Sequence, residues 1–417
     1  MIRVLRNRTY RALFSAQVLA LLGTGLLTVA LGLLAYDLAG DAAGAVLGTA
    51  LTIKMVAYVG VAPLMAALID RLPKKVVLVG SDLIRLLIAV SLPFVTETWQ
   101  IYLLVFVLQS ASATFTPAFQ SVIPSVLPDS RDYTRALALS RLAYDLEALV
   151  SPVLAAALLT FVAYNNLFIG TAIGFACSAV LVLTTTLPNP ERDSTSTTFW
   201  QRLPMGLRVF LRTPSLRFLM LANVVVGAGT ALVLVNSVVY VRATFHLDDA
   251  ALALTVGAYG AGSLLTAFLI PNVVERFGVS RVMTVGAFIV TAGLAFAMGV
   301  SGFFVSPSID WPLLLATWAV IGIGTSLINT PSSRLLADAS TPSNRNLVYT
   351  AQFALSHACF LVTYPIAGWV GATSLFGASA ALFAIAAVAC VGVVVAGTQA
   401  AHSPELSRPS DVRKARL

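Results

Sequence analysis

Charged side chains are scarce in this chain of 417 residues. Asp, Glu, Lys and Arg make up 11% of it, whereas 58% of the residues are hydrophobic. An ordinary soluble domain carries about 25% charged and about 45–50% apolar residues. Twelve membrane-spanning helices of about 20 residues each would use about 240 residues, which is more than half of the chain. The composition therefore excludes an ordinary soluble protein and predicts a polytopic membrane protein.

Residues typical of metal and redox sites are also few, with three Cys and three His in the whole chain. Cys177, Cys359 and Cys390 lie within apolar runs, which indicates small core residues and not a disulfide framework or a zinc site. The chain contains no Gly-x-x-x-x-Gly-Lys, Gly-x-Gly-x-x-Gly or His-Glu-x-x-His motif. We therefore expect no cofactor, no metal and no enzymatic activity, and any energy that the chain uses would have to come from a gradient across the membrane.

Apolar runs of spanning length recur along the chain, separated by charged or turn-forming segments. The twelve predicted spans cover residues 13–38, 45–68, 76–95, 101–122, 138–162, 166–187, 216–240, 250–274, 282–305, 312–332, 347–370 and 374–397. We expect an all-α membrane protein built as two six-helix halves. The predicted divisions are an N-terminal half at 1–187, a linker at 188–214, a C-terminal half at 215–398 and a tail at 399–417.

The distribution of Lys and Arg predicts the orientation in the membrane. With the N-terminus inside, the inner segments hold 23 of the 26 basic residues. The others are Arg242 in an outer loop and Lys54 and Arg85 within spans. The positive-inside rule then places both termini, the linker and the tail in the cytoplasm of a cell (inner) membrane. The net charge of +8 is explained by this topology, so we expect no nucleic-acid partner.

The two halves repeat short motifs. The Asp70-Arg71 pair that follows the second span recurs as Glu275-Arg276, displaced by 205 residues. Thr116-Pro117 recurs as Thr330-Pro331, displaced by 214 residues, and Pro128 and Arg131 recur at that same displacement. A six-plus-six duplication around a central cavity is a recurring plan of secondary transporters.

With these motifs the chain resembles the major facilitator superfamily over almost its whole length. The family's loop between the second and third spans reads Gly-x-x-x-Asp-Arg-x-Gly-Arg-Lys, and both of its glycines are replaced here. The resemblance implies a twelve-helix fold and a cytoplasmic latch between the halves, with topology and helix capping as the simpler role for the same residues. The residues that match the latch motif in its two copies are Asp70, Arg71, Lys74, Lys75, Glu275, Arg276 and Arg281.

Two segments resemble the drug–proton antiporter branch that includes macrolide, enterobactin and nickel exporters. They are Asp82-Leu-Ile-Arg85 at the third span and Thr116-Pro117-Ala118 at the end of the fourth. The chain also departs from that branch. The arginine that many antiporters use for proton coupling would fall at Phe106, and Glu147 takes a glycine position of the fifth-span motif. The resemblance therefore leaves the coupling mechanism and the direction of transport open.

Ionisable side chains within spans are candidates for proton coupling or substrate binding, because each costs about 2.5–3.5 kcal/mol near a helix centre. Tyr144 and Glu147 share one face of the fifth span, and we expect Glu147 to face the transport pathway. Arg141 and Asp145 are four residues apart and can pair on another face. If this helix begins later than predicted, both acids are simply solvated at the cytoplasmic interface.

Two further candidates lie in other spans. His357 is near the middle of the eleventh span, and its unperturbed pKa of about 6.5 suits a proton carrier, although a neutral hydrogen-bonded histidine explains it equally well. Lys54 is one turn from Tyr58 and could bind an anionic group or extend to the interface. Its depth differs from that of Glu147, so we do not assume that the two pair. The candidate cavity residues are Gln17, Tyr58, Gln109, Asn223, Asn236, Asn329 and Gln352, whose amides serve equally well as interhelical hydrogen bonds.

The sequence favours proton-coupled efflux of a small molecule by a monomer that works by alternating access. The cargo is a drug, a metal ion or a siderophore-like compound, and protonation of Glu147 or His357 would shift the equilibrium between inward and outward states. One alternative is an uptake symporter or uniporter for a nutrient or anion that uses Lys54. Another is a membrane sensor or assembly partner that transports nothing. The expected partners are a small-molecule or ion substrate, protons and the lipid bilayer.

Overall fold

The computed structural model describes residues 2–61, 72–187, 207–303, 306–340 and 345–401. The described residues form helices joined by turns and short loops, without a β-strand. Each predicted span overlaps one long helix. These helices are α1 (Arg8–Ala39), α2 (Ala43–Val56), α4 (Lys74–Ser91), α5 (Thr98–Val126), α6 (Ser130–Leu159), α7 (Asn165–Leu183), α9 (Pro214–Val238), α10 (Asp249–Phe277), α11 (Val279–Gly302), α12 (Pro307–Asp338), α13 (Arg345–Pro365) and α14 (Leu375–Ala401). The all-α prediction is confirmed for this part of the chain.

Among the described residues, ten helical stretches are long and apolar enough to cross a membrane. The first, Arg8–Val61, has 54 residues and contains both α1 and α2. An unbroken helix of that length would extend about 80 Å, far beyond a hydrocarbon core of about 30 Å. Gly40 interrupts it with a φ of +52°, a conformation that favours glycine, and α1 and α2 pack on each other. The charge-rich helix α6 is not among the ten.

Three helices end in π-helical turns. These are η3 (Ala57–Val61) after α2, η5 (Val239–Thr244) after α9 and η6 (Ile366–Val370) after α13. A π-helical turn is wider than an α-helical turn, so it changes the direction in which the side chains beyond it point. Tyr58 lies in η3, and Arg242 lies in η5.

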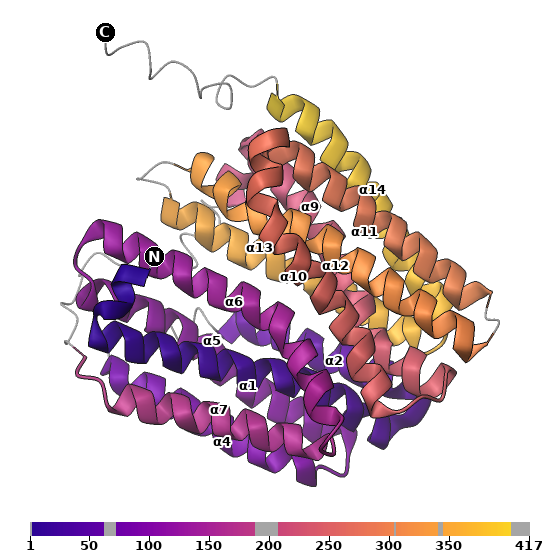
Figure 1. Ribbon diagram of the computed structural model, residues 1–417, viewed down its shortest axis with the longest axis horizontal. Coiled ribbons are helices and arrows are strands. Elements are labelled where there is room, and N and C mark those ends of the chain that lie inside the picture. The colour runs from indigo at the N-terminus through magenta and orange to yellow at the C-terminus, as the bar shows by residue number, and fades with distance from the viewer. Residues whose placement is uncertain (1, 62–71, 188–206, 304–305, 341–344, 402–417) are drawn as a thin grey trace.

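The helices pack as two groups in chain order. Helices α1, α2 and α4–α7 contact one another, as do α9–α14. In Figure 1 the first group is indigo to magenta and the second is rose to yellow. The two groups meet mainly where α6 packs against α10 and where α2 packs against α13 and η6.

The contact between α2 and η6 is close because it is built from glycines. A Cβ atom on Gly48 would lie 2.7 Å from the Cα of Gly368, and one on Gly368 would lie 2.8 Å from the carbonyl oxygen of Gly44. Nearby, the Trp369 indole N–H donates to Thr49 Oγ1 at 3.0 Å. We call these five residues the outer contact, because they lie at the helix ends predicted to face the cell exterior.

The surface of the helices is apolar where a soluble protein would be polar. Helix α4 exposes Leu87 and Val90, which are 65% and 51% accessible, yet it buries Asp82 and Arg85 almost completely. This reversal of the usual arrangement is expected for a helix that faces lipid on one side and packed protein on the other.

Candidate functional site

Glu147 of α6 lies on the wall of a cavity of about 420 Å³ between α6 and α1. The other side chains that line this cavity are all apolar: Phe14, Val18, Leu22, Leu139, Ala143 and Val150. The close approach of the helices positions the carboxylate, since a Cβ on Gly25 of α1 would lie 3.1 Å from Glu147 Oε1. Glu147 is therefore the one ionisable group among the residues that line this cavity.

Lys54 of α2 interacts electrostatically with Glu147 across the first group of helices. Nothing in the sequence indicated this pair, because the two residues sit at different positions along their spans. Counting residues from the end of a span gives the depth of a side chain in the membrane only if the helix is straight and perpendicular to the membrane. A long lysine side chain can also extend several ångströms along the membrane normal, which reduces a difference in depth between two residues. Sequence reasoning therefore offered no reason to assume that Lys54 and Glu147 interact.

Two tyrosines extend the site around Glu147. The Tyr144 hydroxyl lies 3.1 Å from Thr116 Oγ1, and the Gln17 side chain hydrogen-bonds to the same hydroxyl. Tyr58 interacts electrostatically with both Tyr144 and Glu147. The predicted candidates Gln17, Tyr58, Tyr144, Lys54 and Glu147 thus form one connected cluster, which we call the Glu147 cluster.

His357 of α13 contacts this cluster from the second group of helices. Its ring stacks on the Tyr58 ring with centroids 5.4 Å apart and an interplanar angle of 11°. Its Nδ1 atom lies 2.7 Å from the Phe353 carbonyl oxygen. A carbonyl oxygen only accepts, so Nδ1 carries the proton and donates it to this bond. Tyr58 therefore joins the helix group that holds Glu147 to the one that holds His357.

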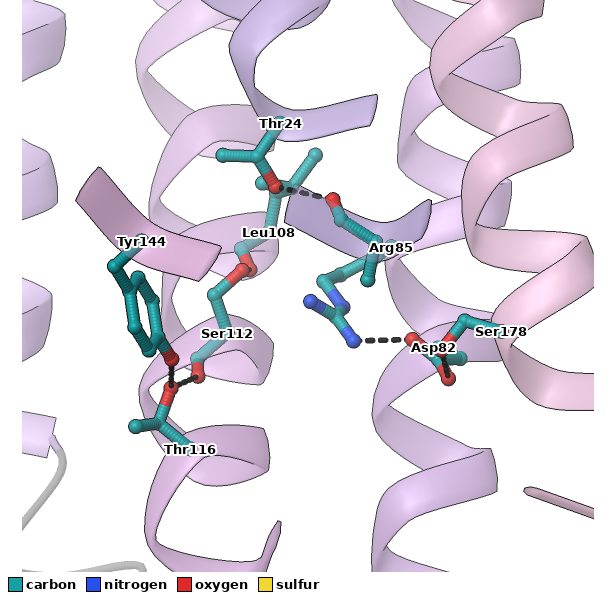
Figure 2. Close-up of polar contacts among 9 residues, drawn as sticks. Thr24, Asp82, Arg85, Leu108, Ser112, Thr116, Tyr144 and Ser178 are labelled. Carbon is teal, nitrogen blue, oxygen red and sulfur yellow. Dashed lines mark hydrogen bonds and ion pairs between the residues drawn. The ribbon is translucent and has the colours of Figure 1, made fainter. Parts of the chain in front are cut away.

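A buried ion pair lies beside the Glu147 cluster (Figure 2). The Arg85 guanidinium pairs with Asp82 one turn earlier on α4, and the Ser178 hydroxyl of α7 donates to Asp82 Oδ2 at 2.7 Å. The guanidinium also lies over the rings of Phe115 and Phe175, at 4.4 and 4.6 Å from their centroids. Sequence reasoning noted Asp82 and Arg85 as a motif but did not include them among the candidate site residues. Two opposite charges three residues apart inside a span were the signal that could have identified them.

Two of the predicted cavity amides, Asn223 and Asn236, make hydrogen bonds between helices, as in the simpler of the two roles that the sequence allowed. Asn223 Nδ2 donates to Gln352 Oε1 at 3.2 Å, and Asn236 Nδ2 donates to the Ala367 carbonyl at 3.1 Å. Gln109 is buried, and its Oε1 has no hydrogen-bond partner among the described atoms. Asn329 is half-buried on α12, where its carbonyl accepts from Ser332.

The latch residues divide into three sets. Lys75 Nζ donates to the carbonyls of Leu183 and Thr185 at 2.7 and 2.8 Å, which caps the end of α7 in its own helix group. Lys74 is buried. The second-copy residues Glu275, Arg276 and Arg281 are exposed, and the guanidinium of Arg276 lies 5.3 Å from the ring of its neighbour Phe277.

Some candidates fall outside the part of the chain that the structure describes. Asp70 and Arg71 lie outside the described residues, as do the side chains of Arg141 and Asp145. Within the described part of the chain, no group of three or more His, Cys, Asp or Glu residues is arranged to hold a metal ion.

Curated relatives of this chain include efflux proteins. Macrolide efflux protein A of Enterococcus faecalis is 24% identical over 173 residues, which is 40% of this chain and 53% of that protein. Macrolide efflux protein A of Streptococcus pyogenes is 22% identical over 221 residues, 51% of this chain and 54% of that protein. The uncharacterized MFS-type transporter YfiS of Bacillus subtilis is 26% identical over 215 residues, with coverages of 49% and 50%. The chain thus spans about half the length of the curated relatives it matches.

Solved structures with the same fold cover nearly the whole chain. A POT family transporter in complex with 5-aminolevulinic acid superimposes with a TM-score of 0.71 at 10% identity, covering 94% of this chain and 97% of that one. A bacterial homolog of the human lysosomal transporter Spinster, inward-facing and unoccupied, gives 0.68 at 14% identity, with coverages of 95% and 98%. The nucleoside transporter NupG gives 0.64 at 17% identity, with coverages of 93% and 98%.

The family model of the Major Facilitator Superfamily matches residues 13–241 and 219–416, which together include nearly all of the sequence. The helices of the structure follow the fold of transporters in that superfamily along the same length. The chain therefore belongs to the Major Facilitator Superfamily and is a membrane transporter, not an enzyme.

Proposed function

We propose that this transporter exports a small organic cation in exchange for protons, by alternating access. The observation that carries the proposal is the position of Glu147, an acidic side chain on an otherwise apolar cavity wall. The apolar side chains favour the body of an organic molecule, and the carboxylate favours its positive group. The resemblance of about half the chain to macrolide efflux proteins supports the outward direction.

Exchange follows from competition for one carboxylate. An ionised Glu147 can bind the cationic group of a substrate, whereas a protonated Glu147 cannot offer that charge. Lys54 interacts with the ionised form and takes the place of the substrate cation when the site is empty. Proton entry from outside would then release the substrate, and proton loss to the cytoplasm would prepare the site to bind again.

His357 is the second candidate for a proton carrier. Its ring contacts Tyr58, which also interacts with Glu147, so a charge on either residue acts on a contact between the two groups of helices. A change of protonation can therefore bias their relative position. This is the step that alternating access needs, because a ligand shifts a conformational equilibrium only through its different affinity for the two states.

The topology we propose has twelve spans. It counts the stretch Arg8–Val61 as two spans and α6 as one more, in addition to the other nine apolar stretches. The N-terminal half at 1–187 and the C-terminal half at 215–398 would form the two moving units. The linker at 188–214, the tail at 399–417 and both termini would lie in the cytoplasm of the cell membrane, with the protein working as a monomer.

The test is efflux from cells that lack their own exporters, measured with tetraphenylphosphonium, nickel, and neutral and anionic toxins, each with and without a protonophore. We expect the wild-type chain to expel tetraphenylphosphonium and the protonophore to abolish this. Glu147→Gln should lose the effect, whereas Asp338→Asn, which changes an exposed carboxylate at the end of α12, should keep it. Uptake of an anion that depends on Lys54 would instead support the symporter alternative. No movement of any solute by protein in the membrane would support a role without transport.

A further inference from the structure

The two groups of helices also meet where the end of α1 contacts η5, at helix ends predicted to face the cell exterior. Tyr36 lies in the last turn of α1, and Arg242 lies in η5. The Tyr36 hydroxyl donates to the Arg242 carbonyl oxygen at 3.1 Å, across 206 residues of chain. The Arg242 guanidinium carbon lies 5.2 Å from the centroid of the Tyr36 ring. The same two residues therefore make two different contacts between the groups.

The position of Arg242 at the end of a helix explains why its carbonyl accepts from a side chain. The last carbonyls of a helix find no donor within that helix. The Leu247 N–H donates to the Val241 carbonyl, one residue before Arg242. His246, which follows η5, has a φ of +55°, a left-handed conformation that is uncommon for a residue other than glycine. π-helical turns and left-handed residues are both frequent at functional sites.

The side chain of Arg242 is held in place by its own helix group. Its Nη1 atom donates to the Leu247 carbonyl at 2.9 Å and lies 3.3 Å from Asp249 Oδ1. The Arg242 side chain is 28% accessible. A guanidinium that is fixed at one end and partly withdrawn from water binds an aromatic face more strongly than a fully solvated one. The second group of helices therefore presents a positioned cation to Tyr36.

The beginning of η5 also contacts the first group of helices. A Cβ atom on Gly44 of α2 would lie 3.1 Å from Val239 Cγ2, and Val239 is the first residue of η5. This turn thus touches α2 through Val239 and α1 through Arg242. Both contacts have to break whenever α1 and α2 move away from η5.

We propose that Tyr36 and Arg242 are positioning residues of the transport cycle: their contact holds the exterior end closed and breaks before the substrate leaves. This inference rests on the proposed function, in which the substrate leaves at that end. The contact consists of a neutral hydrogen bond and a cation–π contact, each of modest strength, so it can form and break in every cycle. Asp249 and the Leu247 carbonyl keep the guanidinium in position throughout, because they belong to the same helix group as Arg242.

The experiment measures how often η5 separates from the first group of helices. The reporter is Val239→Cys in a chain without its three native Cys, because Val239 is 6% accessible and packs beside Gly44. Cells that carry this chain are treated with a thiol reagent that cannot cross the membrane. The labelling rate follows the population of the open state when opening is faster than labelling. The reference is the Val239→Cys chain without a further substitution.

Substitutions of Tyr36 and Arg242 remove the two contacts separately. Tyr36→Phe loses the hydroxyl and keeps the ring, so it should raise the labelling rate about fivefold. Tyr36→Ala loses both contacts and should raise the rate about twentyfold. Arg242→Gln leaves the backbone carbonyl in place and loses the cation, so we expect a rise of about threefold. Arg242→Lys keeps a cation and should lie closer to the reference than Arg242→Gln does.

Tyr164→Phe is the matched control, since it removes a tyrosine hydroxyl from a bond within one helix group. The Tyr164 hydroxyl donates to Asp37, the neighbour of Tyr36 in α1. This substitution should leave the labelling rate unchanged. Labelling that does not rise in the Tyr36 variants, or that rises equally in Tyr164→Phe, overturns the inference. If Tyr36→Ala does not reach the membrane, Tyr36→Phe and the two Arg242 variants decide.

Transport of tetraphenylphosphonium, measured on the same cells, separates this inference from the proposed function. If labelling rises as stated while the unsubstituted chain carries no tetraphenylphosphonium, the closing role stands and the proposed function fails. If the unsubstituted chain transports this cation while labelling in the Tyr36 variants equals the reference, the closing role alone is rejected.

Discussion

The ring of Tyr58 stacks on the ring of His357 with a centroid distance of 5.4 Å, and this contact joins the two groups of helices beside the buried charges. Tyr58 also interacts with Glu147 and Arg85 on its own side. Tyr58 thus contacts the second helix group and interacts electrostatically with charged residues of the first. A change of protonation on either side of it can change how the two groups meet.

The stack itself is testable by removing the ring and by removing only its hydroxyl. Tyr58→Ala should lose an aromatic contact of about 1 kcal/mol, and transport should slow about fivefold. Tyr58→Phe keeps the ring and should keep most of that rate. The measurement is the initial rate of tetraphenylphosphonium transport in proteoliposomes at matched protein content. Equal rates for Tyr58→Ala and the wild type would show that the stack has no role in the cycle.

A bulky substitution in the outer contact should separate α2 from η6 and favour a state that is open toward the cell exterior. Gly48→Val places a side chain where even a Cβ lies 2.7 Å from Gly368, so it should disfavour closure by about 2 kcal/mol, or roughly thirtyfold in population. The readout is the rate at which a thiol reagent that cannot cross the membrane labels Thr49→Cys, in a chain without its three native Cys. Because Thr49 accepts the Trp369 hydrogen bond, the reference is the same Thr49→Cys chain with Gly48 unchanged.

Gly299→Ala of α11 is the matched control for the outer contact. A Cβ there meets nothing within 4 Å, so this substitution should leave labelling unchanged. Labelling that does not rise in Gly48→Val, or that rises equally in Gly299→Ala, would contradict a closing role for the glycine contact.

Substitutions of Lys75 distinguish between its two proposed roles, capping of α7 and a latch between the two halves. Its ammonium donates to two carbonyls at the end of α7, so Lys75→Met should lower the unfolding free energy by about 1 kcal/mol. The Tm of the purified protein should fall, while the labelling at position 49 should not change. Lys75→Arg, which keeps a cationic donor, should recover much of the loss. Altered labelling at an unchanged Tm would instead favour a latch between the halves.

Much of the fold could be predicted from the sequence because hydropathy and charge act locally along each span. The apolar runs located all the long helices of the described structure, and Gly40 lies in the predicted turn between the first two. The shared face of Tyr144 and Glu147 also follows from helical spacing alone. These features depend on residues that are close in the chain.

The rest of the site depends on how separate helices pack. Lys54 interacts with Glu147, about 90 positions away in the chain, and Tyr58 stacks on His357, about 300 positions away. The sequence of one helix does not indicate which residue of another helix it will contact. Asp82 and Arg85 were visible as charges, but their relation to Tyr144 required the positions of α4, α5 and α6. The amides could not be assigned for the same reason, since the Asn223–Gln352 bond exists only once α9 and α13 are side by side.

The central claim is that substrate and proton compete for Glu147, and proton release on binding tests it most directly. Purified protein in weakly buffered detergent solution is mixed with tetraphenylphosphonium, and the proton count is compared with the binding measured on the same sample. We predict that the wild type and Asp338→Asn release protons as they bind, and that Glu147→Gln releases none. Binding without proton release in the wild type, or equal release from Glu147→Gln, would contradict the account.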